Sequence, residues 1–142
     1  MQAALLFLLA CAWPARAAWG PYEASSFESA QRAGWVILLQ FTEDGCQRCA
    51  DQDKILSRRF WGASKKDWTG FQVALTNQAA VAKRWRVTAP STLVLLRGTR
   101  ELARVTGIIV DAEIDAFLRK AELPEPHGRA PPRPRLRWPP RP

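Results

Sequence analysis

A nearly continuous apolar run leads into a pair of cysteines, and this combination constrains the fold more than any other part of the sequence. The run covers residues 35–41, and the pair is Cys46 and Cys49, separated by Gln47 and Arg48. Such a run is typical of a strand that is covered on both faces of a sheet. A C-x-x-C motif that follows a buried strand and opens a helix indicates a redox site more often than a metal site.

Thiol–disulfide exchange explains why a cysteine would stand at a helix start. The reaction needs a thiolate, whereas a free cysteine with a pKa near ~8.5 is mostly protonated at neutral pH. A helix N-terminus presents unpaired N–H groups and a partial positive charge to Cys46, and Arg48 adds a cation, although Glu43 and Asp44 oppose this effect. Cys49, one turn into the helix, is more shielded and attacks a mixed disulfide internally.

The N-terminus is typical of a secretory signal peptide over residues 1–17. The apolar stretch Leu5–Leu9 precedes Pro14 and the small-residue cleavage site Ala15–Ala17. We therefore expect a mature chain that begins at Ala18 and is periplasmic or secreted. An alternative is a lipoprotein signal, in which Cys11 would be acylated and would anchor the chain.

Two further segments follow, a domain over residues 18–123 and a tail over residues 124–142. The tail holds eight of the eleven prolines and five Arg against one Glu, so it carries about half of the net charge of +8. Sequence of this kind predicts a disordered extension. Because the basic character belongs mainly to the tail, the domain is not expected to bind nucleic acid. The tail is either a solvated extension or a contact for anionic surfaces.

Periodicity predicts the order of elements in the domain. We expect helices near residues 25–33, from Cys46 onward, over 78–85 and from 111, and strands over 35–41, 71–75, 92–96 and 101–106. Ser25 begins an apparent capping box, and Gly34 suits the C′ position of the same helix. Leu56 and Phe60 should share the helix face of Cys49. The result is an α/β layer architecture.

Residues 27–123 resemble the thioredoxin-fold family, of the secreted bacterial kind. The resemblance rests on the strand–C-x-x-C–helix unit, on Val87–Pro90 before a strand, and on Val105–Gly107 before the last helix. It also rests on the step of 41 residues from Cys49 to Pro90. The resemblance implies a central mixed sheet of about four strands flanked by helices, with no dissociable cofactor and no metal.

The resemblance also implies roles for individual residues. Cys46 would be the nucleophile, Cys49 the resolving thiol and Pro90 a cis-proline that faces the pair. The residues implied around the substrate groove are Gly45, Arg48, Ala89 and Pro90.

Three positions depart from the family pattern. Gly45 stands where the family usually has Trp, and Gln40 stands where a central strand often carries a buried acid. Pro90 is followed by Ser91 and only then by Thr92, whereas the family tends to place Thr directly after its cis-proline. If Ser91 holds the structural position instead, the chain has no cis-proline.

These features favour a thiol–disulfide oxidoreductase that acts on protein thiols or disulfides and contributes to cell redox homeostasis. A membrane electron donor is a further expected partner, and the direction of electron flow stays open. The alternative is a non-catalytic module of the same fold that binds Cu(I) or a protein partner. Zinc would need two more ligands, and the only histidine is His127 in the tail.

Overall fold

The computed structural model describes residues 19–61 and 65–124, which make up nearly all of the predicted domain. The predicted signal peptide, Cys11 and the predicted tail beyond Pro124 lie outside the described residues. Within the described ranges, no helix is both long enough and apolar enough to cross a membrane.

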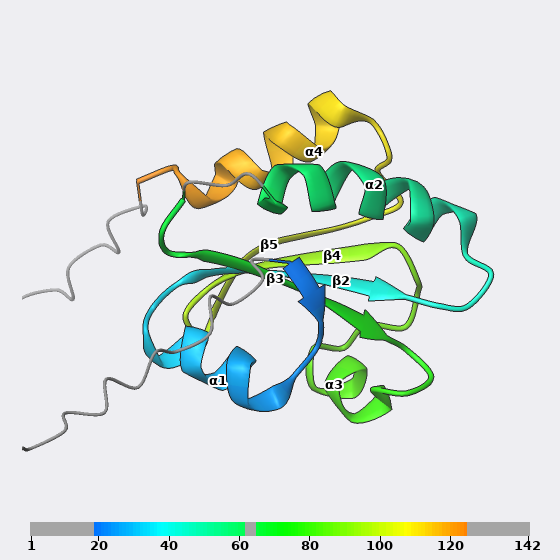
Figure 1. The fold of residues 1–142 in the computed structure, drawn as a ribbon, viewed down its shortest axis with the longest axis horizontal. Coiled ribbons are helices and arrows are strands. Elements are labelled where there is room, and N and C mark those ends of the chain that lie inside the picture. Colours follow the sequence, from blue (N-terminus) through cyan, green and yellow to red (C-terminus); the bar gives the residue numbers. More distant parts are fainter. Residues whose placement is uncertain (1–18, 62–64, 125–142) are drawn as a thin grey trace, which may run out of the picture.

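Within the described residues, five strands form one mixed sheet (Figure 1). In chain order they are β1 Trp19–Pro21, β2 Val36–Thr42, β3 Trp68–Ala74, β4 Thr92–Arg97 and β5 Arg100–Thr106. Their spatial order is β1-β3-β2-β4-β5, with β2 parallel to β3 and antiparallel to β4. The sequence predicts the last four strands. The first, β1, is additional, because three residues that include a glycine and a proline carry no period-2 pattern.

In the part of the chain that the structure describes, four helices cover the two faces of this sheet. They are α1 Ala24–Arg32, α2 Gln47–Trp61, α3 Ala79–Arg84 and α4 Asp111–Leu118, the last continued by the 3₁₀ turn Arg119–Ala121. Figure 1 shows α2 and α4 on one face of the sheet and α1 and α3 on the other. The α/β layer architecture predicted from the sequence is confirmed.

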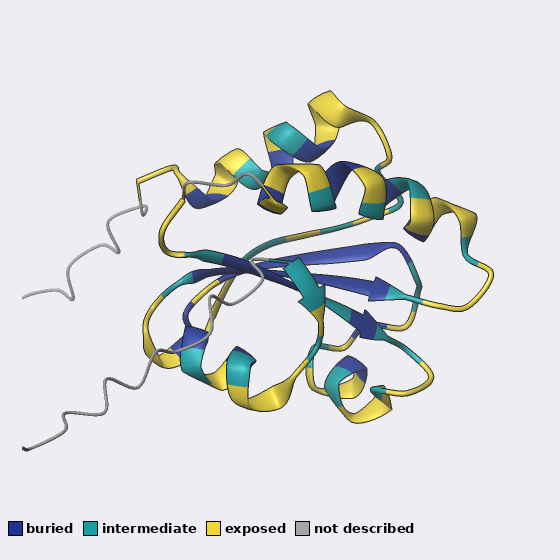
Figure 2. Cartoon of the chain, in the orientation of Figure 1, coloured by how far each residue is buried: buried dark blue, intermediate teal, exposed yellow. Residues whose placement is uncertain are grey.

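Strand β2 is buried on both faces, as its apolar run predicts (Figure 2). Alternate residues point to opposite faces of a strand. Ile37 and Phe41 accordingly belong to the apolar core beneath α1 and α3, whereas Val36 and Leu38 belong to the core beneath α2 and α4. The strand that leads to the cysteines is therefore held rigidly from both sides.

The ends of α1 confirm one local prediction and correct another. The N-cap is Glu23 rather than Ser25, because the Glu23 carboxylate accepts hydrogen bonds from the backbone N–H groups of Ser25 and Ser26. At the other end, Gly34 has a φ of +72° and donates its N–H to the carbonyl of Gln31, at 3.1 Å. This is the C′ position that the glycine predicts.

Candidate active site

The two cysteines form a disulfide at the start of α2. Cys46 immediately precedes the helix and Cys49 lies in its first turn, with their Cα atoms 5.3 Å apart. Cys49, Leu56 and Phe60 are all buried, so the helix face predicted from their spacing is confirmed. Because β2 ends at Thr42, a short loop is enough to bring the disulfide to the end of the central strand.

Cys46 and Cys49 differ in how far they are exposed to solvent. Cys46 is half-buried, whereas Cys49 is only 4% exposed. The backbone N–H of Cys49 donates to Cys46 Sγ at 3.1 Å, in the way that an N-cap side chain receives the third amide of a helix. A negative charge on Cys46 Sγ would be stabilised by the same contact and by the helix N-terminus.

An open groove of about 380 Å³ runs beside the disulfide. The residues that line it come from the loop after β2, the start of α2 and the middle of β3: Thr42, Glu43, Asp44, Gly45, Cys46, Gln47, Cys49, Ala50, Asp53 and Gln72. Of the residues that the family resemblance implies around a substrate groove, Gly45 lines this one. Arg48 reaches instead toward the carbonyl of Gly107, at 3.4 Å, on the loop after β5.

The loop before β4 differs from the expectation of a cis-proline. None of the peptide bonds in residues 19–61 and 65–124 is cis, so Pro90 follows a trans bond. Ser91 makes the turn instead, with a left-handed φ of +55°. Its carbonyl accepts the N–H of Gly107 at 2.9 Å, which joins this loop to the loop after β5. Pro90 and Ala89 are half-buried and do not line the groove beside the disulfide.

Two buried glutamines link the active-site helix to the central strand and to both neighbouring loops. Gln40 Nε2 donates to Cys49 O at 3.0 Å and to Gln52 Oε1 at 3.3 Å. Gln52 Nε2 donates to the carbonyls of Ser91, at 3.0 Å, and Ile108, at 2.8 Å. Since backbone carbonyls can only accept, these contacts fix the orientation of both amides. Gln40 Oε1 is buried and has no hydrogen-bond partner among residues 19–61 and 65–124.

Several solved structures are similar to this chain. The crystal structure of Trxlp from Edwardsiella tarda EIB202 is 30% identical over 70% of this chain and 97% of that chain, with a TM-score of 0.66. A mutant thioredoxin from Halobacterium salinarum NRC-1 is 17% identical over 75% of this chain and 94% of its own, with a TM-score of 0.62. The chain belongs to the thioredoxin-like family. A thioredoxin from Thermus thermophilus is 23% identical over 74% and 86% of the two chains, with a TM-score of 0.57.

No model of a protein family matches the chain, and no curated protein sequence matches it. The structures below 25% identity support the thioredoxin-like fold and nothing finer. The secreted bacterial kind, expected from the sequence, stays a prediction.

Two departures from the thioredoxin-like pattern have visible physical reasons. Gly45 replaces a tryptophan where the backbone has a φ of +77°, a left-handed conformation that side chains rarely adopt. Gln40, fully buried where an acid is common, lies against the backbone of Cys49 as its position predicts. Gln52 is not singled out by the sequence, because a polar residue on a helix is ordinarily solvated. Gln52 acquires its role because the loops that contain Ser91 and Ile108, far along the chain, lie against it in the fold.

A structural metal centre usually needs several ligand side chains close together. Residues 19–61 and 65–124 contain no cluster of three or more His, Cys, Asp or Glu side chains that could hold a metal ion.

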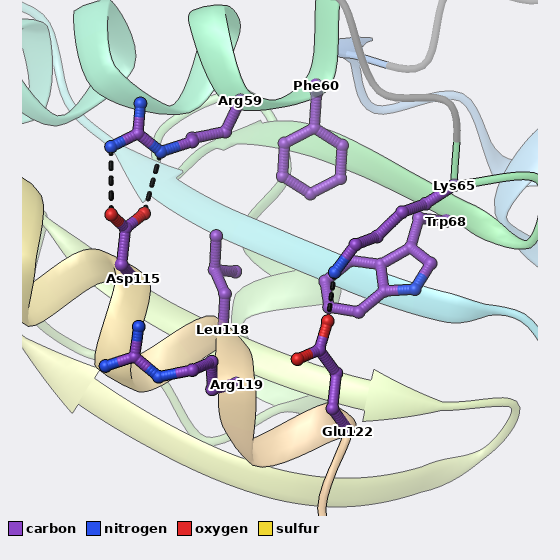
Figure 3. Close-up of a pocket in the computed structure, with 8 residues that line it drawn as sticks. All are labelled: Arg59, Phe60, Lys65, Trp68, Asp115, Leu118, Arg119 and Glu122. Atoms are coloured by element: carbon purple, nitrogen blue, oxygen red, sulfur yellow. Dashed lines mark hydrogen bonds and ion pairs between the residues drawn. The ribbon is translucent and has the colours of Figure 1, made fainter.

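A second hollow, of about 200 Å³, lies at the far end of α2 (Figure 3). Arg59 of α2 binds Asp115 of α4 at 2.7 Å, and Lys65 forms an ion pair with Glu122. The hydrogen bond from Arg59 lowers the pKa of Asp115. Because these residues come from the end of α2 opposite the disulfide, we assign them to the packing of α4 on α2.

Proposed function

We propose that this protein is a thiol–disulfide oxidoreductase that acts on cysteines of other proteins through Cys46 and Cys49. The observation that carries the proposal is the unequal exposure of the two cysteines. Cys46 is half-buried at a helix start and its Sγ accepts an N–H, while Cys49 is only 4% exposed. This arrangement provides an entry thiol and an internal thiol in one turn of helix.

The exchange proceeds in two steps. The Cys46 thiolate attacks one sulfur of a substrate disulfide, a mixed disulfide forms, and the other substrate sulfur leaves as a thiolate. The Cys49 thiolate then attacks Cys46 Sγ, which restores the intramolecular disulfide and releases the second substrate thiolate. The substrate gains two electrons and the protein dithiol loses them. The same steps in reverse oxidise a substrate dithiol.

Continued turnover requires a second redox partner. One thioredoxin of this fold, a thioredoxin f2, is solved in a complex with ferredoxin:thioredoxin reductase. We propose a comparable role for a protein electron donor, membrane-bound if the chain is periplasmic as its N-terminus predicts. A lipoprotein anchored at Cys11 would place the same site at a membrane surface.

Reduction of insulin disulfides in the presence of dithiothreitol tests the proposal. We expect turnover by the wild-type protein and none by Cys46→Ser. Cys49→Ser, reduced beforehand and then freed of dithiothreitol, should accumulate covalent complexes with insulin chains. Cys11→Ser is the control and should turn over normally. Stoichiometric Cu(I) binding without any turnover would contradict the proposal and favour a non-catalytic module. The reduction potential of the Cys46–Cys49 pair, measured against glutathione, then shows whether the protein favours reducing or oxidising its substrates.

A further inference from the structure

Asp53 brings a carboxylate to the groove beside the disulfide from the helix that carries Cys49. It follows Cys49 by four residues, about one helical turn, so the two side chains share a face of α2. Asp53 also lines the same groove as Cys46 and Cys49. We propose that Asp53 accepts the proton that the Cys49 thiol releases when it resolves a mixed disulfide. This inference rests on the proposed function.

The surroundings of Asp53 fix one carboxylate oxygen and leave the other unbound. Oδ1 accepts hydrogen bonds from Trp19 Nε1, at 2.8 Å, and from Gln72 Nε2, at 2.7 Å. Within residues 19–61 and 65–124, Oδ2 accepts no hydrogen bond, and no Lys or Arg forms an ion pair with Asp53. The carboxylate is therefore held in one orientation while it keeps an oxygen on which a proton can bind.

The other groups near Asp53 are less suited to this task. Gln40 and Gln72 are register partners on β2 and β3, and a neutral amide cannot take up the proton. Neither β1 nor β3 carries a charged side chain. Glu43 and Asp44 also line the groove, but both are exposed on the loop before Cys46 rather than on the helix face of Cys49.

The proposed step balances in protons and electrons. The proton of the Cys49 thiol passes through water in the open groove to Oδ2 of Asp53. The Cys49 thiolate attacks Cys46 Sγ, the Cys46–Cys49 bond forms, and the bond from Cys46 to the substrate sulfur breaks. The substrate departs with the electron pair of that bond, and Asp53 returns the proton to it or to solvent.

Stopped-flow reaction with 5,5′-dithiobis(2-nitrobenzoic acid) separates the two thiols. In the full chain carrying Cys11→Ser, labelling of Cys46 releases one thionitrobenzoate, and resolution by Cys49 releases a second. We expect Asp53→Asn to slow the second release roughly tenfold at pH 6.5 and to leave the first unchanged. Above about pH 9 the rates of the second release should become equal in the two proteins, because the Cys49 thiol then ionises without a base. Asp53→Glu should restore much of the rate.

Asp51→Asn is the matched control, since Asp51 lies on the same helix, pairs with Lys54 and does not line the groove. It should resolve like the parent chain. An unchanged Asp53→Asn rate, or equal slowing at every pH, would overturn the role of Asp53 as proton acceptor. If Asp53→Asn does not fold, Asp53→Ser takes its place in the same comparison with the parent chain. Failure of the parent to react in two phases would overturn the proposed function instead.

Discussion

The side-chain amide of Gln40 donates a hydrogen bond of 3.0 Å to the backbone carbonyl of Cys49. The central strand is thereby joined to the first turn of the helix that carries the disulfide. The amide also faces Gln52 Oε1, so both groups in front of its nitrogen are acceptors. Because both neighbouring groups accept hydrogen bonds, we expect position 40 to require a side chain that donates them.

Gln40→Glu should destabilise the fold at neutral pH by roughly 2–5 kcal/mol, because a fully buried carboxylate would face two acceptors. Burial would raise the pKa of the new carboxyl above its unfolded value, so the penalty should grow as pH rises through the acid range and shrink as pH falls. Urea unfolding at pH 5 and pH 8 measures the difference. Gln47→Glu, exposed at the same helix, is the control, and equal losses in both variants would contradict the expectation.

The reduced protein should react with iodoacetamide first at Cys46. Cys49 is only 4% exposed, and Cys46 Sγ accepts the N–H that favours its thiolate. Peptide mass mapping after limited alkylation measures the order. Equal or faster labelling of Cys49 would reverse the roles given to the two thiols.

Glu23→Ala should lower the melting temperature above about pH 5, because α1 loses its N-cap. Hydrogen bonds from Ser26 and Ser25 lower the pKa of Glu23 from 4.5 to about 2. A lowered folded-state pKa means that the stabilisation is complete above the unfolded value and is lost as pH falls toward 2. The gap between wild type and variant should therefore close over that range. Glu28→Ala, an exposed site in α1, should leave no comparable gap in thermal scans.

Gly70→Ala should destabilise the chain by about 1–3 kcal/mol and displace β1. A Cβ at Gly70 would lie 2.3 Å from the ring of Trp19, which packs on this glycine from the neighbouring strand. Gly20→Ala is the matched control, because a Cβ there would meet nothing within 4 Å. Urea unfolding should show a loss for the first variant only, and equal stability of the two would mean that Trp19 does not fix the edge strand.

The sequence predicts those helices and strands whose apolar residues are regularly spaced or that carry a sequence motif. The apolar run of β2 and the cysteine spacing determine the central strand and the active-site helix, and both lie within one residue of the expected bounds. Strand β1 is too short to show a period, and Trp19 packs on Gly70 of β3, a contact that no local pattern indicates. Local patterns could not rank Glu23 above Ser25 as a cap, since both side chains can accept an N–H.

The residues of the candidate site are likewise predictable only where they belong to such helices and strands. Gln40 and Cys49 lie within elements that the sequence predicts, and Cys46 directly precedes one of them. The roles of Gln52 and Asp53 depend on groups that tertiary structure brings to α2 from far along the chain, namely Ser91 for Gln52 and Trp19 for Asp53. The order Pro90, Ser91, Thr92 leaves a cis and a trans bond before Pro90 equally open in the sequence, and only the structure shows the trans bond and the left-handed φ of Ser91.

The helix that carries the disulfide is fastened at several points that involve neither sulfur. Gln52 binds it to two loops, Asp53 to β1 and β3, and Arg59 to α4. Opening the disulfide breaks none of these contacts, so we expect the backbone of the oxidised and reduced forms to superimpose. Electron transfer would then carry little reorganisation energy, and a partner would meet the same molecular surface before and after the exchange.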